Sequence, residues 1–252
     1  MTRVIVWGGD AAVVGLAALT VFAGAALIAW GRAASLGRWL LAVGTMVGLF
    51  ALAVLSVRRG ADPYGSLATA LAGVLAFGAF WSVALEPVGA RVQAALGALA
   101  ALTMAGLLVA PLPAVGAILG DMTYNLSGWS YVAGAGVLVA GLARDAAAGD
   151  SAPTATPYLS LATLCLTVAL AAQGAATQWA WGTYWMGDPL ECLHLAGWIA
   201  VALGWVIAEE FPRHPRAVVG SLWMAAGIVI AVLLGATPLI QALGLPSLHL
   251  VS

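Results

Sequence analysis

Eight apolar runs, each long enough to cross a bilayer, constrain this chain more than any other feature of its sequence. They cover roughly residues 10–30, 39–57, 64–85, 92–111, 125–143, 158–178, 190–208 and 217–237. A helix needs about 20 apolar residues to cross the hydrocarbon core. Because backbone N–H and C=O groups in lipid must be bonded within the segment, runs of this length form helices. The sequence therefore predicts an all-α fold, a polytopic transmembrane bundle of eight spans within a single integral membrane domain, residues 1–252.

The composition identifies the lipid bilayer as the surroundings of this bundle. Of the 252 residues, 63% are apolar and 8% are charged, whereas soluble domains contain about 25% charged residues. A soluble fold of this length has too little interior to bury so much apolar surface. The net charge of −1 provides no basic stripe for a nucleic acid, so no nucleic-acid partner is expected.

Several functional classes lack the residues they need. The three histidines, His194, His214 and His249, are too widely separated to form a zinc site. The sequence contains no GxxxxGK[ST] phosphate-binding loop, and its two cysteines have no CxxC spacing. Few ionisable groups lie deep in a span and no pair of broken helices is present, which disfavours a transporter. No hydrolase or nucleotide-binding chemistry is expected.

The arginines predict the orientation of the bundle. An even number of spans places both termini on one side of the membrane. If that side is extracytoplasmic, six arginines lie on cytoplasmic loops and three outside, as the positive-inside rule favours. The cytoplasmic set is Arg32, Arg38, Arg91, Arg144, Arg213 and Arg216, and the outer set is Arg3, Arg58 and Arg59. We therefore expect a protein of the bacterial cytoplasmic membrane with extracytoplasmic termini.

The stretch 179–191, a predicted extracytoplasmic loop, gathers aromatic and acidic side chains that the rest of the chain largely lacks. Its members are Trp179, Trp181, Tyr184, Trp185, Asp188 and Glu191. Single rings near span ends are typical interfacial anchors; Trp7, Trp30, Trp39, Trp129 and Trp223 fit that description. Four rings beside two carboxylates exceed what an anchor needs. Clustered indoles form a flat apolar platform, and Gly182 and Gly187 permit tight turns that bring rings onto one surface.

The residues 181–191, WGTYWMGDPLE, resemble the tryptophan-rich WWD signature, approximately WGxYWxWDPxE, of the CcsA/CcmC/CcmF-type cytochrome c assembly proteins. Trp198 and the pair Ser130-Tyr131 also resemble features of that family, as does the segment from Leu243 to His249. One departure is that Gly187 stands where the signature has its second Trp before Asp. Another is that Thr123 stands where the family has its first axial histidine.

The resemblance implies a haem-handling function at the extracytoplasmic face, with haem held on the Trp-rich platform and passed to an apocytochrome c. By position, Trp181, Tyr184 and Trp185 would line the macrocycle beside Trp179, and His249 would be an axial ligand of the iron. Asp188 and Glu191 would shape the loop or meet the apoprotein. Met122, beside Thr123, is a substitute ligand, because methionine ligates haem iron in some cytochromes. We further expect Arg58 and Arg59 to pair with the haem propionates.

Two functions remain open at this point. The first is cytochrome c biogenesis by presentation or transfer of haem, as one part of a ligation system. The second is a haem-free relative that serves as a structural subunit of a larger membrane complex, since a Trp and two histidines of the pattern are missing. Thr123 and Val206 stand at the two histidine positions. His194, in the seventh span, either contacts a cofactor or hydrogen-bonds a neighbouring helix, because a histidine inside a span is costly without such a role.

Overall fold

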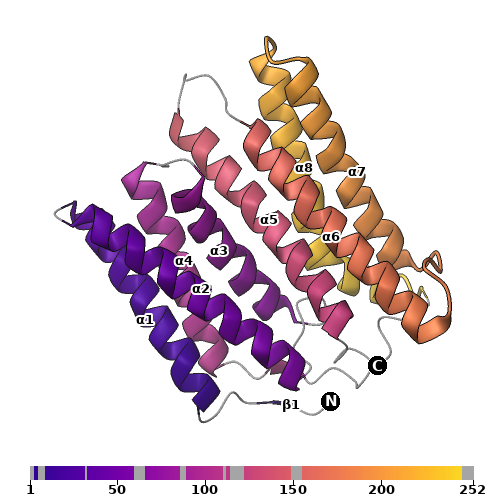
Figure 1. Ribbon diagram of the computed structural model, residues 1–252, viewed down its shortest axis with the longest axis horizontal. Coiled ribbons are helices and arrows are strands. Elements are labelled where there is room, and N and C mark those ends of the chain that lie inside the picture. Colours follow the sequence, from indigo (N-terminus) through magenta and orange to yellow (C-terminus); the bar gives the residue numbers. More distant parts are fainter. Residues whose placement is uncertain are drawn as a thin grey trace.

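The computed structural model describes residues 3–4, 9–31, 33–59, 66–85, 89–109, 112–113, 122–148 and 155–245. Eight long helices account for nearly all of these residues (Figure 1). They are α1 (Gly9–Trp30), α2 (Ala34–Arg59), α3 (Leu67–Ala84), α4 (Ala90–Val109), α5 (Met122–Ala148), α6 (Thr156–Trp181), α7 (Pro189–Glu210) and α8 (Pro215–Ala242). Two two-residue strands, β1 (Arg3–Val4) and β2 (Leu112–Pro113), pair antiparallel.

The predicted all-α bundle of eight spans is confirmed. Each of the eight helices is long and apolar enough to cross a membrane, so the chain is a multi-pass membrane protein. Most boundaries lie within a few residues of the apolar runs. The largest difference is α5, which begins before and ends after the predicted span 125–143, because Asp145 and its neighbours continue the helix to Ala148.

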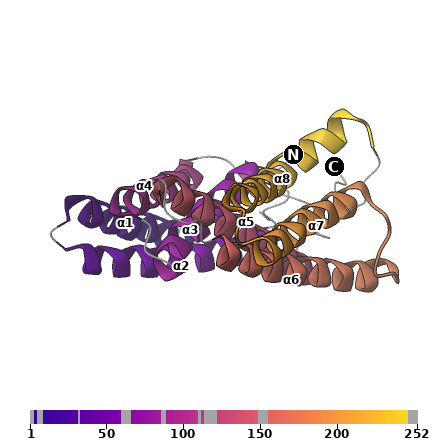
Figure 2. The same cartoon turned by 90° about the horizontal axis from the view of Figure 1, so that it is seen from above.

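The helices form two groups of four that lie side by side along the long axis of the molecule (Figures 1 and 2). In the first half, α1–α4, each helix contacts the next and α4 returns to contact α1; the second half, α5–α8, repeats this cyclic order. The halves meet where α3 packs against α5. Successive helices are antiparallel, so the end of α6 and the start of α7 lie at the same end of the bundle as the start of α1.

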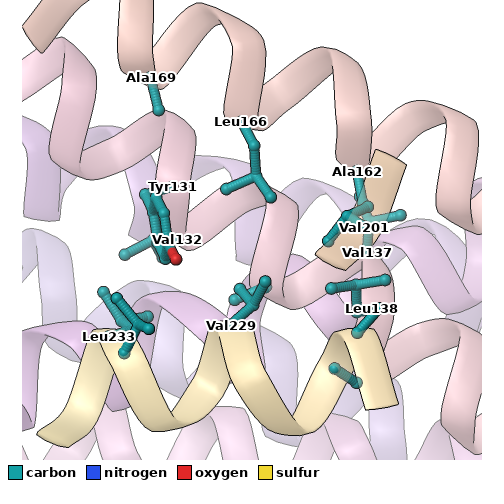
Figure 3. Close-up of a cluster of buried hydrophobic side chains, with 14 of the residues drawn as sticks. Tyr131, Val132, Val137, Leu138, Ala162, Leu166, Ala169, Val201, Val229 and Leu233 are labelled. Atoms are coloured by element: carbon teal, nitrogen blue, oxygen red, sulfur yellow. The ribbon is translucent and has the colours of Figure 1, made fainter. Parts of the chain in front are cut away.

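The interior of the second half is a continuous apolar cluster contributed by all four helices. Figure 3 shows Ala162, Leu166 and Ala169 of α6 pointing toward side chains of α5, with Val229 and Leu233 of α8 on the opposite side. The first half has two smaller buried clusters. Their helices approach closely at glycines: a Cβ on Gly24 of α1 would lie 2.6 Å from the Leu41 backbone nitrogen of α2.

Trp129 joins the two halves. We expected it to be an interfacial anchor, but its ring is only partly exposed and packs against the buried clusters of both halves. Its indole Nε1 donates a hydrogen bond to Ser56 Oγ of α2, at 3.1 Å. Its position in the second turn of α5, facing α2 and α3 rather than lipid, explains the difference, because a sequence pattern does not reveal which neighbours a helix face has.

Candidate functional site

The aromatic stretch forms the tight connection between α6 and α7. Trp179 and Trp181 belong to the last turn of α6, so the connecting turn is shorter than the stretch 179–191 and runs from Gly182 to Asp188. Gly182 ends α6 in a left-handed conformation (φ 74°), and its N–H donates to Gln178 O at 2.9 Å. Such a left-handed glycine is a common helix C-terminus, and it directs the chain back toward α7 (Figure 1).

The rings of this turn lie on the surface of the protein. We call the four rings Trp179, Trp181, Tyr184 and Trp185 the aromatic ledge, and the end of the bundle that carries it the ledge end. Trp179 is 82% exposed, Tyr184 69% and Trp185 44%, while Trp181 is partly exposed. The exposed side chains of Trp179, Tyr184 and Trp185 are accessible to an apolar ligand or a protein partner.

The two carboxylates beneath the ledge cap α7. Asp188 is the N-cap residue, its side chain accepts from Leu190 N at 2.8 Å, and Pro189 occupies the first helical position. Glu191, three residues after Asp188, completes the reciprocal arrangement by accepting from Asp188 N at 3.3 Å. This is a capping box, which satisfies backbone N–H groups that the first helical turn leaves without a partner. Two roles were left open for Asp188 and Glu191, shaping the loop and meeting an apoprotein. Because both side chains are buried, the structure favours the first role.

Glu191 also connects the turn to α6. Its side chain is 1% exposed. Oε1 accepts from Thr177 Oγ1 of α6 at 3.1 Å, and Oε2 accepts from Met186 N of the turn at 3.0 Å. The Glu191 carboxylate, at the start of α7, therefore bonds both α6 and the turn. These bonds connect the ledge to the two helices.

A second polar contact lies one turn deeper between the same helices. His194 of α7 is 1% exposed, and its Nδ1 lies 3.0 Å from Gln173 Oε1 of α6. The ring of Tyr131 in α5 is 4.7 Å from that of His194, centroid to centroid. Of the two roles considered for His194, the structure shows a hydrogen bond to a neighbouring helix. It also places the imidazole beneath the ledge and away from its surface.

Gly187 explains why the turn departs from the signature pattern. This residue adopts φ 71°, a left-handed conformation that side chains larger than glycine rarely adopt without strain. A Trp at this position, as in the signature, would be strained in the observed turn. The rings of the stretch therefore lie at positions 179–185, and the capping carboxylate Asp188 follows Gly187 directly.

The other predicted site residues are distributed as follows. Arg58 and Arg59 end α2 and Met122 begins α5; because α2 runs toward the ledge end and α5 runs away from it, all three backbones lie at that end. The Ser56–Trp129 hydrogen bond confirms that these parts of α2 and α5 are adjacent. The side chains of these three residues lie outside the described part of the structure, as does the whole of His249.

Sequence reasoning missed Gln173 and Thr177, which bind His194 and Glu191 from the opposite helix. A signal was available: the two residues are four positions apart and therefore share one face of α6, and they are polar in an otherwise apolar run. Their partners could not be found in the same way, because pairing depends on which face of α7 meets α6. Within the described residues, no group of three or more His, Cys, Asp or Glu side chains could hold a metal ion.

No protein-family model, no curated protein and no solved structure matches this chain. Any function must therefore be inferred from the residues and their geometry.

Proposed function

We propose that this protein presents haem on the aromatic ledge, at the extracytoplasmic face of the bacterial cytoplasmic membrane, for transfer to an apocytochrome c. The observation that carries the proposal is the exposure of Trp179 at the end of α6 and of Tyr184 and Trp185 on the turn, whose backbone bonds Glu191. Exposed aromatic rings fit a large planar apolar ligand. The resemblance of residues 181–191 to the WWD signature adds the identity of that ligand.

Two kinds of support favour haem: the observed exposure of the ledge rings and the positions of the other residues along the chain. The described ledge supplies the apolar platform. His249 and Met122 would bind the iron, because imidazole and thioether both bind haem iron. Arg58 and Arg59 end a helix at the ledge end and would pair with the propionates. When bound, haem supplies vinyl groups for thioether formation with an apocytochrome. The residues named here would hold and orient it.

The orientation rests on the arginine distribution. Six arginines would lie at the end opposite the ledge and three at the ledge end, which the positive-inside rule favours for an extracytoplasmic ledge. An apocytochrome and the larger assembly complex would then approach from the same side as the haem.

A hemin titration of the purified chain in mild detergent tests the proposal. We expect a Soret band for the wild type, and a weakening of hemin binding by about ten- to a thousandfold or more in the variant W179A/Y184A/W185A, at about 0.5–1.5 kcal/mol per ring. The matched control is W30A/W39A, which removes two equally exposed rings, 72% and 71%, at the opposite end of the bundle. His249→Ala should weaken the band further. Equal binding by the ledge and control variants would exclude the ledge as the haem site.

A second function, that of a haem-free structural subunit, is favoured by two observations. The left-handed conformation of Gly187 disfavours the second Trp of the signature at that position, and His194 is buried with Gln173 rather than presented at the surface. In this case the ledge would be covered by another membrane subunit. The absence of a Soret band under every condition, together with crosslinks from a photoreactive group at Tyr184 to a co-purifying subunit, would establish this alternative.

A further inference from the structure

The contact that sets the position of the ledge is the buried carboxylate of Glu191. It accepts hydrogen bonds from Met186 N and Asp188 N in the turn and from Thr177 Oγ1 in α6, at 3.0, 3.3 and 3.1 Å. Both backbone donors lie immediately around Gly187, the left-handed residue of the turn. Glycine is the residue whose backbone loses most freedom on ordering. The carboxylate therefore acts where the chain would otherwise be most mobile.

The base of this contact is rigid. Thr177 is fully buried, and its hydroxyl also bonds Gln173 O of its own helix at 2.9 Å. The Gln173 side chain in turn bonds His194, which packs against Tyr131 of α5. The turn also lies against α6 directly, because a Cβ built on Gly174 would be 3.3 Å from Tyr184 O. Through these contacts the position of the turn depends on three helices of the second half, α5, α6 and α7.

We propose that Glu191 is the positioning residue of the aromatic ledge, and that it holds the turn in one conformation through hydrogen-bond geometry rather than through its charge. With Glu191 in place, Tyr184 and Trp185 are held ready for a planar tetrapyrrole before it binds, so less ordering entropy is lost on binding. The statement about the tetrapyrrole rests on the proposed function; the statement about the turn does not.

The substitution Glu191→Gln separates geometry from charge. In E191Q the new amide oxygen can still accept from Met186 N and Asp188 N, and the new NH₂ group can donate to Thr177 Oγ1, which keeps its own bond to Gln173 O. All of these groups then remain satisfied without a negative charge. Substitution by Ala removes every one of these bonds. A geometric role thus predicts that E191Q resembles the wild type, and a charge role predicts that it resembles E191A.

Two measurements on the full chain in detergent test the proposal: hydrogen exchange of the amides in residues 183–190, and the dissociation constant for hemin. We expect E191A to raise exchange in the turn about tenfold and to weaken hemin binding about tenfold, with E191Q close to the wild type in both. Thr177→Val, which removes one of the bonds, should lie between them and serves if E191A does not fold. Glu209→Ala, which removes an exposed carboxylate near the opposite end, should leave the turn unchanged.

The outcomes are distinguishable. Unchanged exchange in E191A and T177V, or equal exchange in E191Q and E191A, would overturn the positioning role. Raised exchange in E191A without any loss of hemin affinity would show that the positioning of the turn by Glu191 does not contribute to hemin binding. If the wild type itself binds no hemin, the proposed function fails, and the exchange data alone still decide whether Glu191 fixes the turn.

Discussion

The two halves of the bundle have the same cyclic order of helices and different interiors. In α1–α4, the buried hydroxyls of Thr45 and Ser56 bond carbonyls of their own helices. Gln93 of α4 bonds across helices, to Ser82 O of α3 and to Arg38 of α2, at the end opposite the ledge. In α5–α8, polar side chains bond across helices, with Gln173 to His194 and Thr177 to Glu191. These bonds between α6 and α7 lie directly beneath the aromatic ledge.

The contacts across helices named here therefore lie at opposite ends of the bundle in the two halves. Close glycine packing in lipid gives stability through van der Waals contact and needs no polar groups. Polar side chains inside a membrane are costly and are concentrated where a function needs them. We infer that the first half is a scaffold and that the second half carries the site. Substitutions in each half test this division, and they follow in order of their expected effect on stability.

The largest effect is expected for Gly24→Val in the first half. A Cβ there would lie 2.6 Å from Leu41 N and 2.7 Å from Gly37 O. Because both are backbone atoms that no rotamer change can move, the helices must separate, and we expect a loss of about 3 kcal/mol or more. Thermal unfolding in detergent measures it. The control is Gly106→Ala in α4, where nothing lies within 4 Å and the better helix propensity of Ala should give a gain of up to about 1 kcal/mol. Equal midpoints for both variants would contradict glycine-mediated packing.

A smaller effect is expected for Gly197→Ala in the second half. There the new methyl group would meet the hydroxyl of Tyr131, a side-chain atom, rather than backbone. We expect a loss of about 2 kcal/mol. Because the obstacle is one oxygen, Tyr131→Phe in the same chain should recover about half of that loss. The measurement is again the thermal midpoint of the two single variants and the double variant. Additive losses would show that the hydroxyl is not what occupies this space.

A third prediction concerns the polar contact beneath the ledge. His194→Leu and Gln173→Leu should each lower the free energy of unfolding by about 1 kcal/mol, a typical value for hydrogen bonds between membrane helices. In a double-mutant cycle the losses should be less than additive, because each single variant leaves the other partner buried without this bond. His194→Leu should leave the Soret band of added hemin in place. Disappearance of that band would instead make His194 an iron ligand.

The smallest effect on stability is expected for Trp179→Ala on the ledge. The ring is 82% exposed, so its removal should change stability by less than about 0.5 kcal/mol. Hemin affinity should nevertheless fall several-fold. Trp179→Ala should thus affect hemin affinity more than stability, whereas Gly24→Val should affect stability more than hemin affinity. The matched variant Trp30→Ala, at the opposite end, should change neither quantity. A large loss of stability in W179A would show that the ring supports the fold instead of a ligand.

The fold was largely predictable from the sequence, and the site only in part. Apolar runs of about 20 residues predict helices wherever they occur, and all eight are confirmed. The ledge residues were recognisable because four rings in seven positions are unusual in an apolar chain. Glu191 was recognised as a member of the stretch, but its bonds to Thr177 and Met186 were not, because they depend on how the turn folds back on α6. Gly187 was seen as a permitted turn residue; its left-handed φ explains why no Trp stands there.

The order of amino acids was enough to establish that this chain spans a membrane eight times, because the cost of an unbonded backbone in lipid leaves a long apolar run only the helix. It was also enough to locate the aromatic rings along the chain. The packing of the helices settled the rest: that they divide into two groups of four, that Trp129 joins these groups, and that His194 and Glu191 face α6. Those outcomes depend on contacts between residues far apart in the sequence, and helix faces that are almost uniformly apolar carry no pattern that specifies which of them will meet.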